Sequence, residues 1–345
     1  MESLRINFVV EDMGAFRYLG CATLARELYI ALSRIVDIDW NGKGNDYDIF
    51  HFHTFGPYAL YRLKVSKGIN ILTSHSVPSI NVGNVVGGEN LWRVVYRWIY
   101  NRFDHIIAVS HTSERELRSI GVRKPSTVIY NGIDLDRFCF SEEKRKRFRE
   151  RYNLGDRFVV LNVGQKTPRK GIYDFVKVAR RIKEAVFVWV GGMPYRFLSK
   201  DASKVRRIEQ EAPENVIFTG YVPDVVESYS SADVLLAPTY GETFGLTHAE
   251  ALACNLPVVT RDLEVLREVY DGRILFGRNV EEFVEIIRRL MDDEDMRRRY
   301  SGCRDFVRER FDIRRIGEEH LKLYKRLLDE RASNDLGEGW GRSRI

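Results

Sequence analysis

The sequence predicts an α/β protein of two Rossmann-like domains, each built on a parallel, doubly wound sheet. The chain has 345 residues, which is too many for one ordinary core and, at about 150 residues per domain, indicates two. Short apolar, β-branched runs alternate with longer amphipathic stretches, which is the pattern of βαβ units. This alternation stops at a basic stretch, residues 142–151, and then starts again. We therefore expect a second sheet after that stretch.

The expected strands follow from these apolar runs. In the first domain they are residues 5–10, 48–52, 70–73, 105–109 and 126–130. In the second domain they are residues 158–163, 186–190, 216–219, 234–237, 257–260 and 274–276. Two helical patterns, about 296–310 and 313–332, close the chain, the second because Leu321, Tyr324, Leu327 and Leu328 recur at helical spacing. Ligands of open α/β sheets bind beyond the carboxyl ends of the strands, which here predicts a cleft between the domains.

The same patterns predict where the domains begin and end. We expect a first domain at residues 1–137, a basic linker at 138–154, a second domain at 155–312 and a closing helix at 313–332. Residues 333–345 are Gly-rich and polar, so we expect a disordered tail.

Composition limits the class of protein. With 44% hydrophobic and 30% charged residues, the chain matches soluble globular proteins. It has no signal-peptide pattern and no run of the roughly 18 apolar residues that a membrane span needs, so we expect a cytoplasmic protein. The net charge of +6 is spread over both halves, which excludes a basic nucleic-acid-binding domain. Four isolated cysteines indicate neither a disulfide framework nor a zinc site; they are Cys21, Cys139, Cys254 and Cys303.

The most informative segment runs from Thr239 to Val259. It places Glu242 and Glu250 around the start of an expected helix, where two carboxylates can hold one polyhydroxylated ligand. The first N–H groups of a helix have no intrahelical partners, and such groups suit a diphosphate. In this segment they belong to Thr243, Phe244, Gly245 and Leu246. We therefore interpret the segment as a binding site for a sugar nucleotide.

In its full context this segment resembles the signature of the retaining GT-B glycosyltransferases of group 1, or family GT4. Supporting motifs stand in the family's order at residues 71–75, 106–110, 128–134, 162–171, 190–192 and 218–222, and the resemblance covers roughly residues 4 to 330. It implies the GT-B fold, in which two Rossmann-like domains face an interdomain cleft. It also implies transfer of a hexose from a UDP- or GDP-sugar to a carbohydrate or lipid-linked hydroxyl, without a bound metal or other cofactor.

The resemblance assigns roles to four charged residues. Lys170, preceded by Arg169, should contact the donor phosphates, where transfer builds up negative charge. Glu250 should accept hydrogen bonds from the ribose, and Glu242 should contact the donor sugar. Each residue also has a structural interpretation. Arg169 and Lys170 could be solvated charges, Glu250 an exposed helix residue, and Glu242 a carboxylate favoured by the helix dipole.

Three further residues follow from the same resemblance. His75 matches the first-domain histidine that reaches the donor sugar or diphosphate, and Tyr221 is a candidate for contact with the base. Gly20 corresponds to the first glycine of a phosphate-approaching loop, whose second glycine is Cys21 here. Family members often carry Arg at the position of Gln165. Gln165 and Cys21 are thus two departures from the family pattern that bear on the level of activity.

Two other features allow more than one interpretation. His51 and His53 alternate on a strand and point the same way, but no third ligand has suitable spacing, so we expect no metal site. Residues 91–103 mix aromatic and arginine side chains at helical spacing. They suit either a helix that covers the sheet or one that lies in a membrane interface. Peripheral contact with the inner, anionic membrane face is our hypothesis for the second case, in keeping with a lipid-linked acceptor.

Two alternative functions remain open at this level. An epimerase that acts on nucleotide sugars could share the two-domain architecture, but the chain does not obviously present the acid/base residues that it would need. A binding subunit without turnover is the other, because Gln165 and Cys21 depart from the family pattern.

Overall fold

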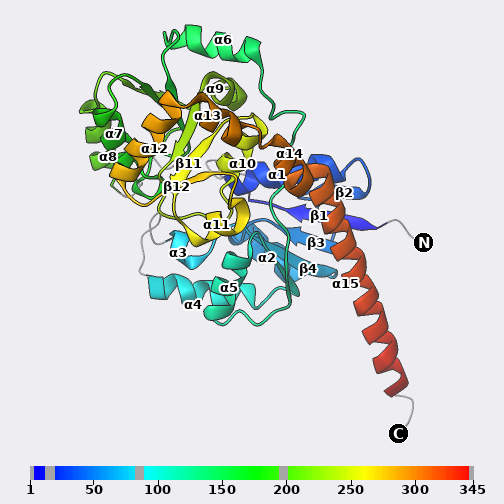
Figure 1. Ribbon diagram of the computed structural model, residues 1–345. Coiled ribbons are helices and arrows are strands. Elements are labelled where there is room, and N and C mark those ends of the chain that lie inside the picture. Colours follow the sequence, from blue (N-terminus) through cyan, green and yellow to red (C-terminus); the bar gives the residue numbers. More distant parts are fainter. Residues whose placement is uncertain (1–3, 12–19, 82–88, 194–200, 342–345) are drawn as a thin grey trace. The chain divides into compact units, whose positions relative to one another are not determined.

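The computed structural model describes residues 4–11, 20–81, 89–193 and 201–341, and the chain forms two compact units. Unit 1 comprises Met1–His75, Val94–Gly132 and Ile313–Ile345, and unit 2 comprises Ser76–Arg93 and Ile133–Asp312. Each unit contains one six-stranded parallel sheet with helices around it (Figure 1). The predicted α/β class with two doubly wound sheets is therefore confirmed.

The sheet of unit 1 has the strand order β2-β1-β3-β4-β5-β6. The strands are β1 (Arg5–Val9), β2 (Asp37–Trp40), β3 (Ile49–Phe52), β4 (Ile69–Ser74), β5 (His105–Ala108) and β6 (Ser126–Val128). Central strands such as β3 are buried along their whole length, because helices cover both faces of a parallel sheet. The sequence did not predict β2, an edge strand in which aspartates alternate with apolar residues.

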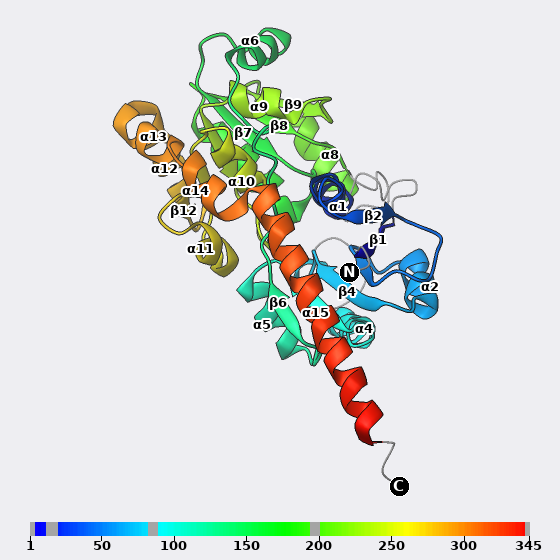
Figure 2. The same ribbon diagram turned by 90° about the vertical axis from the view of Figure 1, so that its right-hand side faces the viewer.

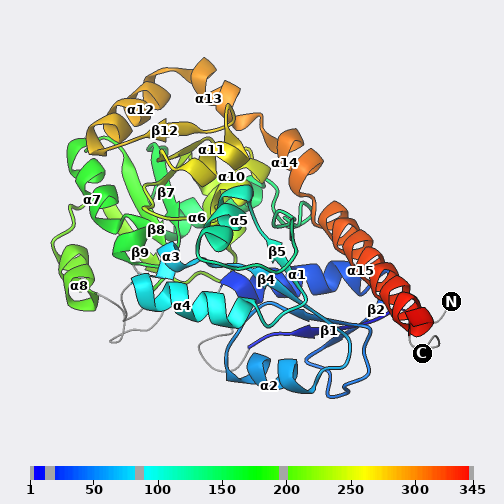
Figure 3. The same cartoon turned by 90° about the horizontal axis from the view of Figure 1, so that it is seen from below.

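Helices cover both faces of this sheet. They are α1 (Gly20–Leu32), α2 (Pro57–Val65), α4 (Glu89–Tyr100), which begins in unit 2, α5 (His111–Ser119) and α15 (Ile313–Gly341). Figure 3 shows α1 on one side of the sheet and α2 on the other, as right-handed crossovers on either side of β1 require. Helix α15 packs beside α1 (Figure 2), and its Ile316 and Tyr324 join the core that holds Leu28 and Phe8.

The sheet of unit 2 has the strand order β12-β11-β10-β7-β8-β9. Its strands are β7 (Val159–Val163), β8 (Val186–Val190), β9 (Val216–Gly220), β10 (Val234–Ala237), β11 (Val258–Arg261) and β12 (Leu275–Gly277), and each coincides with an expected segment. Around it lie α3 (Pro78–Asn81), α6 (Glu142–Arg151), a 3₁₀ turn η2 (Pro168–Lys170), α7 (Ile172–Arg181), α8 (Ala202–Gln210), α9 (Val225–Ser231), α10 (Leu246–Ala253), α11 (Glu264–Tyr270), α12 (Val280–Asp292), α13 (Glu294–Ser301) and α14 (Arg304–Phe311). The single helix predicted near 296–310 is thus two helices, separated at Gly302 and Cys303.

The predicted basic linker, residues 138–154, is corrected by the structure. The division between the units falls between Gly132 and Ile133, and the basic stretch forms α6, which packs on α9 within unit 2. Ser141 caps α6 by accepting a hydrogen bond from the Lys144 N–H, and Phe148 is fully buried. The sequence does not indicate this packing, because most of the helix is charged and little apolar periodicity is left.

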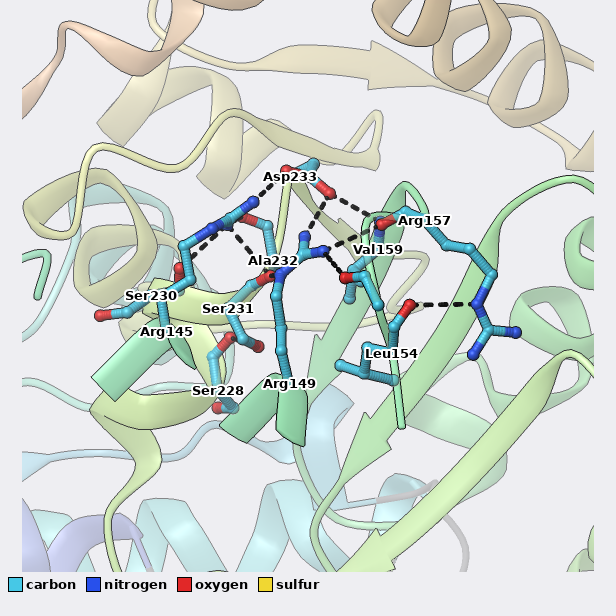
Figure 4. Close-up of polar contacts among 11 residues, drawn as sticks. Arg145, Arg149, Leu154, Arg157, Val159, Ser228, Ser230, Ser231, Ala232 and Asp233 are labelled. Carbon is cyan, nitrogen blue, oxygen red and sulfur yellow. Dashed lines mark hydrogen bonds and ion pairs between the residues drawn. The ribbon is translucent and has the colours of Figure 1, made fainter. Parts of the chain in front are cut away.

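Two arginines of α6 bind Asp233, which lies between α9 and β10 (Figure 4). Arg145 Nη2 lies 3.2 Å from Asp233 Oδ1, and Arg149 Nη2 lies 2.9 Å from Asp233 Oδ2. The Val159 N–H donates to the same carboxylate at 2.8 Å. Arg149 also donates through Nε to the Ser231 carbonyl at 2.9 Å. Asp233 therefore joins α6 and α9 to the start of β7.

The end of the chain also differs from the prediction. Disorder was expected from residue 333, whereas α15 continues to Gly341; residues 342–345 lie outside the described part. Extending an existing helix adds one hydrogen bond per residue without a new nucleation step. The glycines in this stretch therefore do not end the helix where composition alone suggests.

Removing the charge of Asp233 should destabilise unit 2. Asp233→Asn leaves Arg149, whose side chain is only 11% exposed, without its carboxylate. We expect a loss of about 2 kcal/mol, between the values for exposed and buried pairs, and a lower Tm in thermal unfolding. Glu143→Gln, which removes an exposed partner of Arg147 on the same helix, is the control and should leave the Tm nearly unchanged. Equal Tm values for the two variants would contradict this account of α6.

Candidate functional site

The segment after β10 contains the helix start that the sequence predicts. Helix α10 begins at Leu246, and Gly245 precedes it with φ +84°. A Cβ at Gly245 would lie 2.8 Å from Leu266 Cδ2, so both the backbone conformation and the space favour glycine. Phe244 is buried, and its ring packs on Tyr270 and Phe311. Its side chain therefore belongs to the core, and any ligand contact from Phe244 must come from its backbone.

Lys170 and Glu242 form an ion pair beyond the carboxyl ends of two interior strands of the unit 2 sheet. Lys170 Nζ lies 2.5 Å from Glu242 Oε1, and the two side chains are 18% and 10% exposed. The residues follow β7 and β10, which are neighbours in the sheet, so their carboxyl ends bring the two loops together. Gly171 lets them approach, since it has φ +79° and a Cβ there would lie 2.2 Å from the Pro238 carbonyl oxygen.

Arg169 ties the same two loops together. Its Nη1 donates to the Gly241 carbonyl at 2.7 Å, and its own carbonyl accepts from the Tyr240 N–H at 2.7 Å. The structure thus shows Arg169 holding the loop that carries Glu242. Its contact with the donor phosphates stays a prediction.

Glu250 lies near enough to this pair for its charge to act on Lys170. It is on α10, and its Oε2 accepts a hydrogen bond from the Tyr229 hydroxyl at 2.5 Å. Its negative charge also acts on the pKa of Lys170. The structure therefore brings together Glu242, Glu250 and Lys170, which the sequence placed in one site. Tyr229, on the short helix α9, was not predicted, because no motif or periodicity marks it.

Charge and burial oppose each other in this site. Burial alone would raise the pKa of Glu242, but the positive charges of Lys170 and Arg169 outweigh it and lower that pKa to about 2. Burial lowers the pKa of Lys170, against the opposing effect of Glu242. At neutral pH Glu242 is therefore a carboxylate with a cationic partner, which can accept hydrogen bonds but not donate them.

A second group of residues supports the loop before Glu242. The Tyr240 hydroxyl donates to Asp174 Oδ2 at 2.6 Å, and Arg261 Nη2 binds the same oxygen at 2.6 Å. The Arg261 guanidinium also lies 3.9 Å from the centre of the Tyr240 ring. Asp174 and Arg261 come from α7 and β11, far apart in the sequence, so no local motif connects them with the site.

Tyr221 follows β9 and is 66% exposed. A Cβ at Gly192 would lie 2.5 Å from Tyr221 Cε2, so the ring rests directly on the Gly192 backbone. An exposed ring supported in this way has a face open to a stacking partner. Its contact with a nucleotide base stays a prediction.

The remaining predicted site residues belong to unit 1. Gly20 begins α1, and residues 12–19 before it lie outside the described part. His75 follows β4, and its Nε2 lies 3.1 Å from His53 Nδ1. Burial lowers the pKa of His75 to about 4, so the ring is neutral at pH 7. Its role towards the donor stays a prediction.

His51 and His53 are bound to protein groups. Both ring nitrogens of His51 lie 2.6 Å from hydroxyls, Nδ1 from Tyr324 and Nε2 from Thr73. Across the described residues no group of three or more His, Cys, Asp or Glu is arranged to hold a metal ion. The histidine pair therefore links β3 to β4 and α15.

Helix α4 carries apolar side chains on its outer face. Leu91, Val94 and Trp98 are 57%, 55% and 56% exposed, and the Arg102 guanidinium lies 3.8 Å from the Trp98 ring centre. The opposite face is buried through residues such as Tyr96. Helix α4 therefore packs one face against the protein and exposes an apolar face that has the Arg102 guanidinium beside it. In the described part of the chain, no helix combines the length and apolar character that crossing a bilayer requires.

Comparison with known proteins covers both units. The profile of the glycosyl transferases group 1 matches residues 144–302, and that of Glycosyltransferase Family 4 matches residues 20–137. The chain is 31% identical over 250 residues to the alpha-galactosylglucosyldiacylglycerol synthase of Streptococcus pneumoniae, covering 70% of this chain and 67% of that protein. It is 32% identical over 252 residues to the processive diacylglycerol alpha-glucosyltransferase of Acholeplasma laidlawii, covering 69% and 74%.

Among solved structures, HepE of Anabaena in complex with UDP-glucose is similar along nearly the whole chain. The TM-score is 0.76 at 17% identity, over 96% of this chain and 99% of that one. A likeness at this identity establishes the architecture, which is the two-domain GT-B fold.

The ion pair should make stability depend on pH in acid. Because the pKa of Glu242 falls from 4.5 to about 2 on folding, the folded protein binds fewer protons. The pair's contribution is therefore complete above about pH 4.5 and is lost as the pH falls towards 2. Glu242→Gln should lower the Tm at pH 7, with a loss of up to about 3 kcal/mol. The Tm difference from the wild type should shrink between pH 4.5 and the acid limit of folding; a constant difference would rule out this ionisation.

Proposed function

Since the chain belongs to the group 1 glycosyltransferases, also called family 4, we propose that it moves a hexose from a UDP- or GDP-sugar to a carbohydrate or lipid-linked hydroxyl, with retention of the anomeric configuration. The observation that carries this proposal is the meeting of Lys170, Glu242 and Glu250 beyond the carboxyl ends of β7 and β10. The site thus combines a cation that can bind phosphate with carboxylates that can bind hydroxyl groups.

The diphosphate of the donor is proposed to bind at Lys170 and at the start of α10. Cleavage of the sugar–phosphate bond leaves negative charge on the departing diphosphate, and a fixed cation in a site screened from water stabilises that charge most strongly. Lys170 is mostly buried, and Arg169 lies beside it. With this positive charge in place we propose that the step needs no metal ion.

The two carboxylates are proposed to bind the two sugars of the donor. Glu242, an acceptor at neutral pH, binds hydroxyls of the hexose, and Glu250 binds the ribose hydroxyls. Neither is proposed as a nucleophile. In the transfer step the bond from the sugar C1 to the diphosphate oxygen breaks on the same face on which the acceptor oxygen forms its new bond. The acceptor proton passes to the departing β-phosphate.

A lipid-linked acceptor is supported by two observations. Both curated relatives described above carry diacylglycerol in their names. Helix α4 presents Leu91, Val94 and Trp98 to the exterior with Arg102 beside the indole, a combination that suits the interface of an anionic membrane. We therefore propose that the enzyme works at a membrane surface and contacts it through α4.

Loss of the Lys170 charge should slow transfer strongly. Lys170→Ala should lower kcat by 100-fold or more, about 2.7 kcal/mol, as for other fixed groups that stabilise a developing anion. The assay follows release of UDP or GDP from a panel of UDP- and GDP-hexoses, with vesicles that contain monoglucosyl diacylglycerol as acceptor. Lys204→Ala, at an exposed lysine of α8, is the control and should retain full activity. Nucleotide release that does not depend on the acceptor would contradict the proposal.

Membrane contact through α4 should require its exposed indole. In flotation at low salt, the wild type should rise with vesicles that contain anionic lipid and should do so less with neutral ones. Trp98→Ser should reduce the bound fraction several-fold. Tyr61→Ser, which removes a comparably exposed ring from α2, should bind as the wild type does. If the wild type does not float with anionic vesicles, the membrane proposal fails while the transfer reaction stands.

A further inference from the structure

Tyr229 is a buried tyrosine whose hydroxyl reaches a carboxylate of the candidate site. Its side chain is 1% exposed, and its hydroxyl donates to Glu250 Oε2 at 2.5 Å. Its ring also packs near that of Phe138, with 6.3 Å between ring centres. A buried tyrosine normally directs its hydroxyl to a partner within the protein. Here that partner is the residue to which ribose binding is assigned.

The helix that carries Tyr229 is held from its other side by α6. The Ser230 and Ser231 carbonyls at the end of α9 each accept from Arg145 Nη1 at 3.2 Å (Figure 4). Near the start of α9, Glu227 pairs with Arg151, with 2.7 Å between Nη1 and Oε2. A seven-residue helix has little stability of its own. Its position, and with it that of Tyr229, therefore depends on these contacts.

We propose that Tyr229 is a positioning residue that orients Glu250 for recognition of the ribose hydroxyls of the donor nucleotide. This inference rests on the proposed function. The Glu250 carboxylate has two oxygens. The Tyr229 hydroxyl holds Oε2, which orients the plane of the carboxylate and so the position of Oε1. Two neighbouring ribose hydroxyls require such a set plane, because they meet the carboxylate from one direction. Tyr229 itself makes no contact with the nucleotide.

The protonation state of the tyrosine fits this role. Burial raises the pKa of Tyr229 well above its usual value, and the charge of Glu250 raises it further. The hydroxyl therefore keeps its proton and remains a donor at physiological pH. Phenylalanine preserves the shape of the ring and removes only this donor, which makes Tyr229→Phe the direct test.

The experiment compares nucleotides that differ only in a ribose hydroxyl. Calorimetry measures the Kd of UDP, 2′-deoxy-UDP, GDP and 2′-deoxy-GDP, and the ratio of deoxy to ribo Kd is the readout. For the nucleotide that the wild type prefers, we expect a ratio of about 10, since a hydrogen bond to a charged group is worth a factor of that size. In Tyr229→Phe the ratio should fall to about 3 or less, mainly through weaker binding of the ribonucleotide.

A matched control removes a different buried hydroxyl of the same unit. Tyr270 is fully buried, and its hydroxyl donates to the Gly245 carbonyl at 3.0 Å. Tyr270→Phe should lower the Tm and leave the ratio near that of the wild type. Glu250→Ala should reduce the ratio to about 1. If Tyr229→Phe does not fold, Glu250→Asp tests the same contact, because it draws the carboxylate away from the Tyr229 hydroxyl by one methylene.

The outcomes separate this inference from the proposed function. A Tyr229→Phe protein that binds both forms more weakly but keeps the wild-type ratio overturns the inference, since the tyrosine is then only structural. A wild-type ratio in Glu250→Asp, or a wild type without preference for ribose, overturns it as well. If neither UDP nor GDP binds the wild type, the proposed function itself fails.

Discussion

The short contact between Lys170 and Glu242 is the interaction on which the candidate site depends. It places two opposite charges in a largely buried position, where each would be costly without the other. Two loops must come close for the contact to form, and Gly171 allows this because any side chain there would strike the Pro238 carbonyl. Arg169 then joins the loops, because its guanidinium donates to the Gly241 carbonyl and its own carbonyl accepts from the Tyr240 N–H. The diphosphate of the proposed donor would meet there a cation whose position is already set.

A series of contacts within unit 2 connects the candidate site to residues that lie farther from it. Glu250 is bound by Tyr229, Tyr229 is carried by α9, and α9 is held by arginines of α6 that also bind Asp233. These groups lie between residues 141 and 250, so no single short stretch of sequence contains them all. A basic stretch with the composition of a linker thus has a structural function at some distance from the reacting groups.

Unit 1 uses its buried polar groups in another way. His51 is bonded through both ring nitrogens, and His75 is kept neutral by burial. The contact of His51 with Tyr324 joins the closing helix α15 to the central strands of the sheet. The outer face of α4, by contrast, has apolar side chains that are more than half exposed, and a membrane contact is proposed there.

The sequence alone determined the α/β class, the two sheets and all six strands of unit 2, because periodicity is a local property. Its motifs also determined the family, and through the family the grouping of Glu242, Glu250 and Lys170. It did not reveal β2, the packing of α6, the length of α15 or the role of Tyr229. Each of these depends on partners distant in the chain: α6 is stabilised by an aspartate more than 80 residues away, and Tyr229 is recognisable only beside Glu250. Tertiary structure decided them, because a charged or aromatic side chain has no preference of its own for one distant partner until the fold brings that partner within hydrogen-bonding distance.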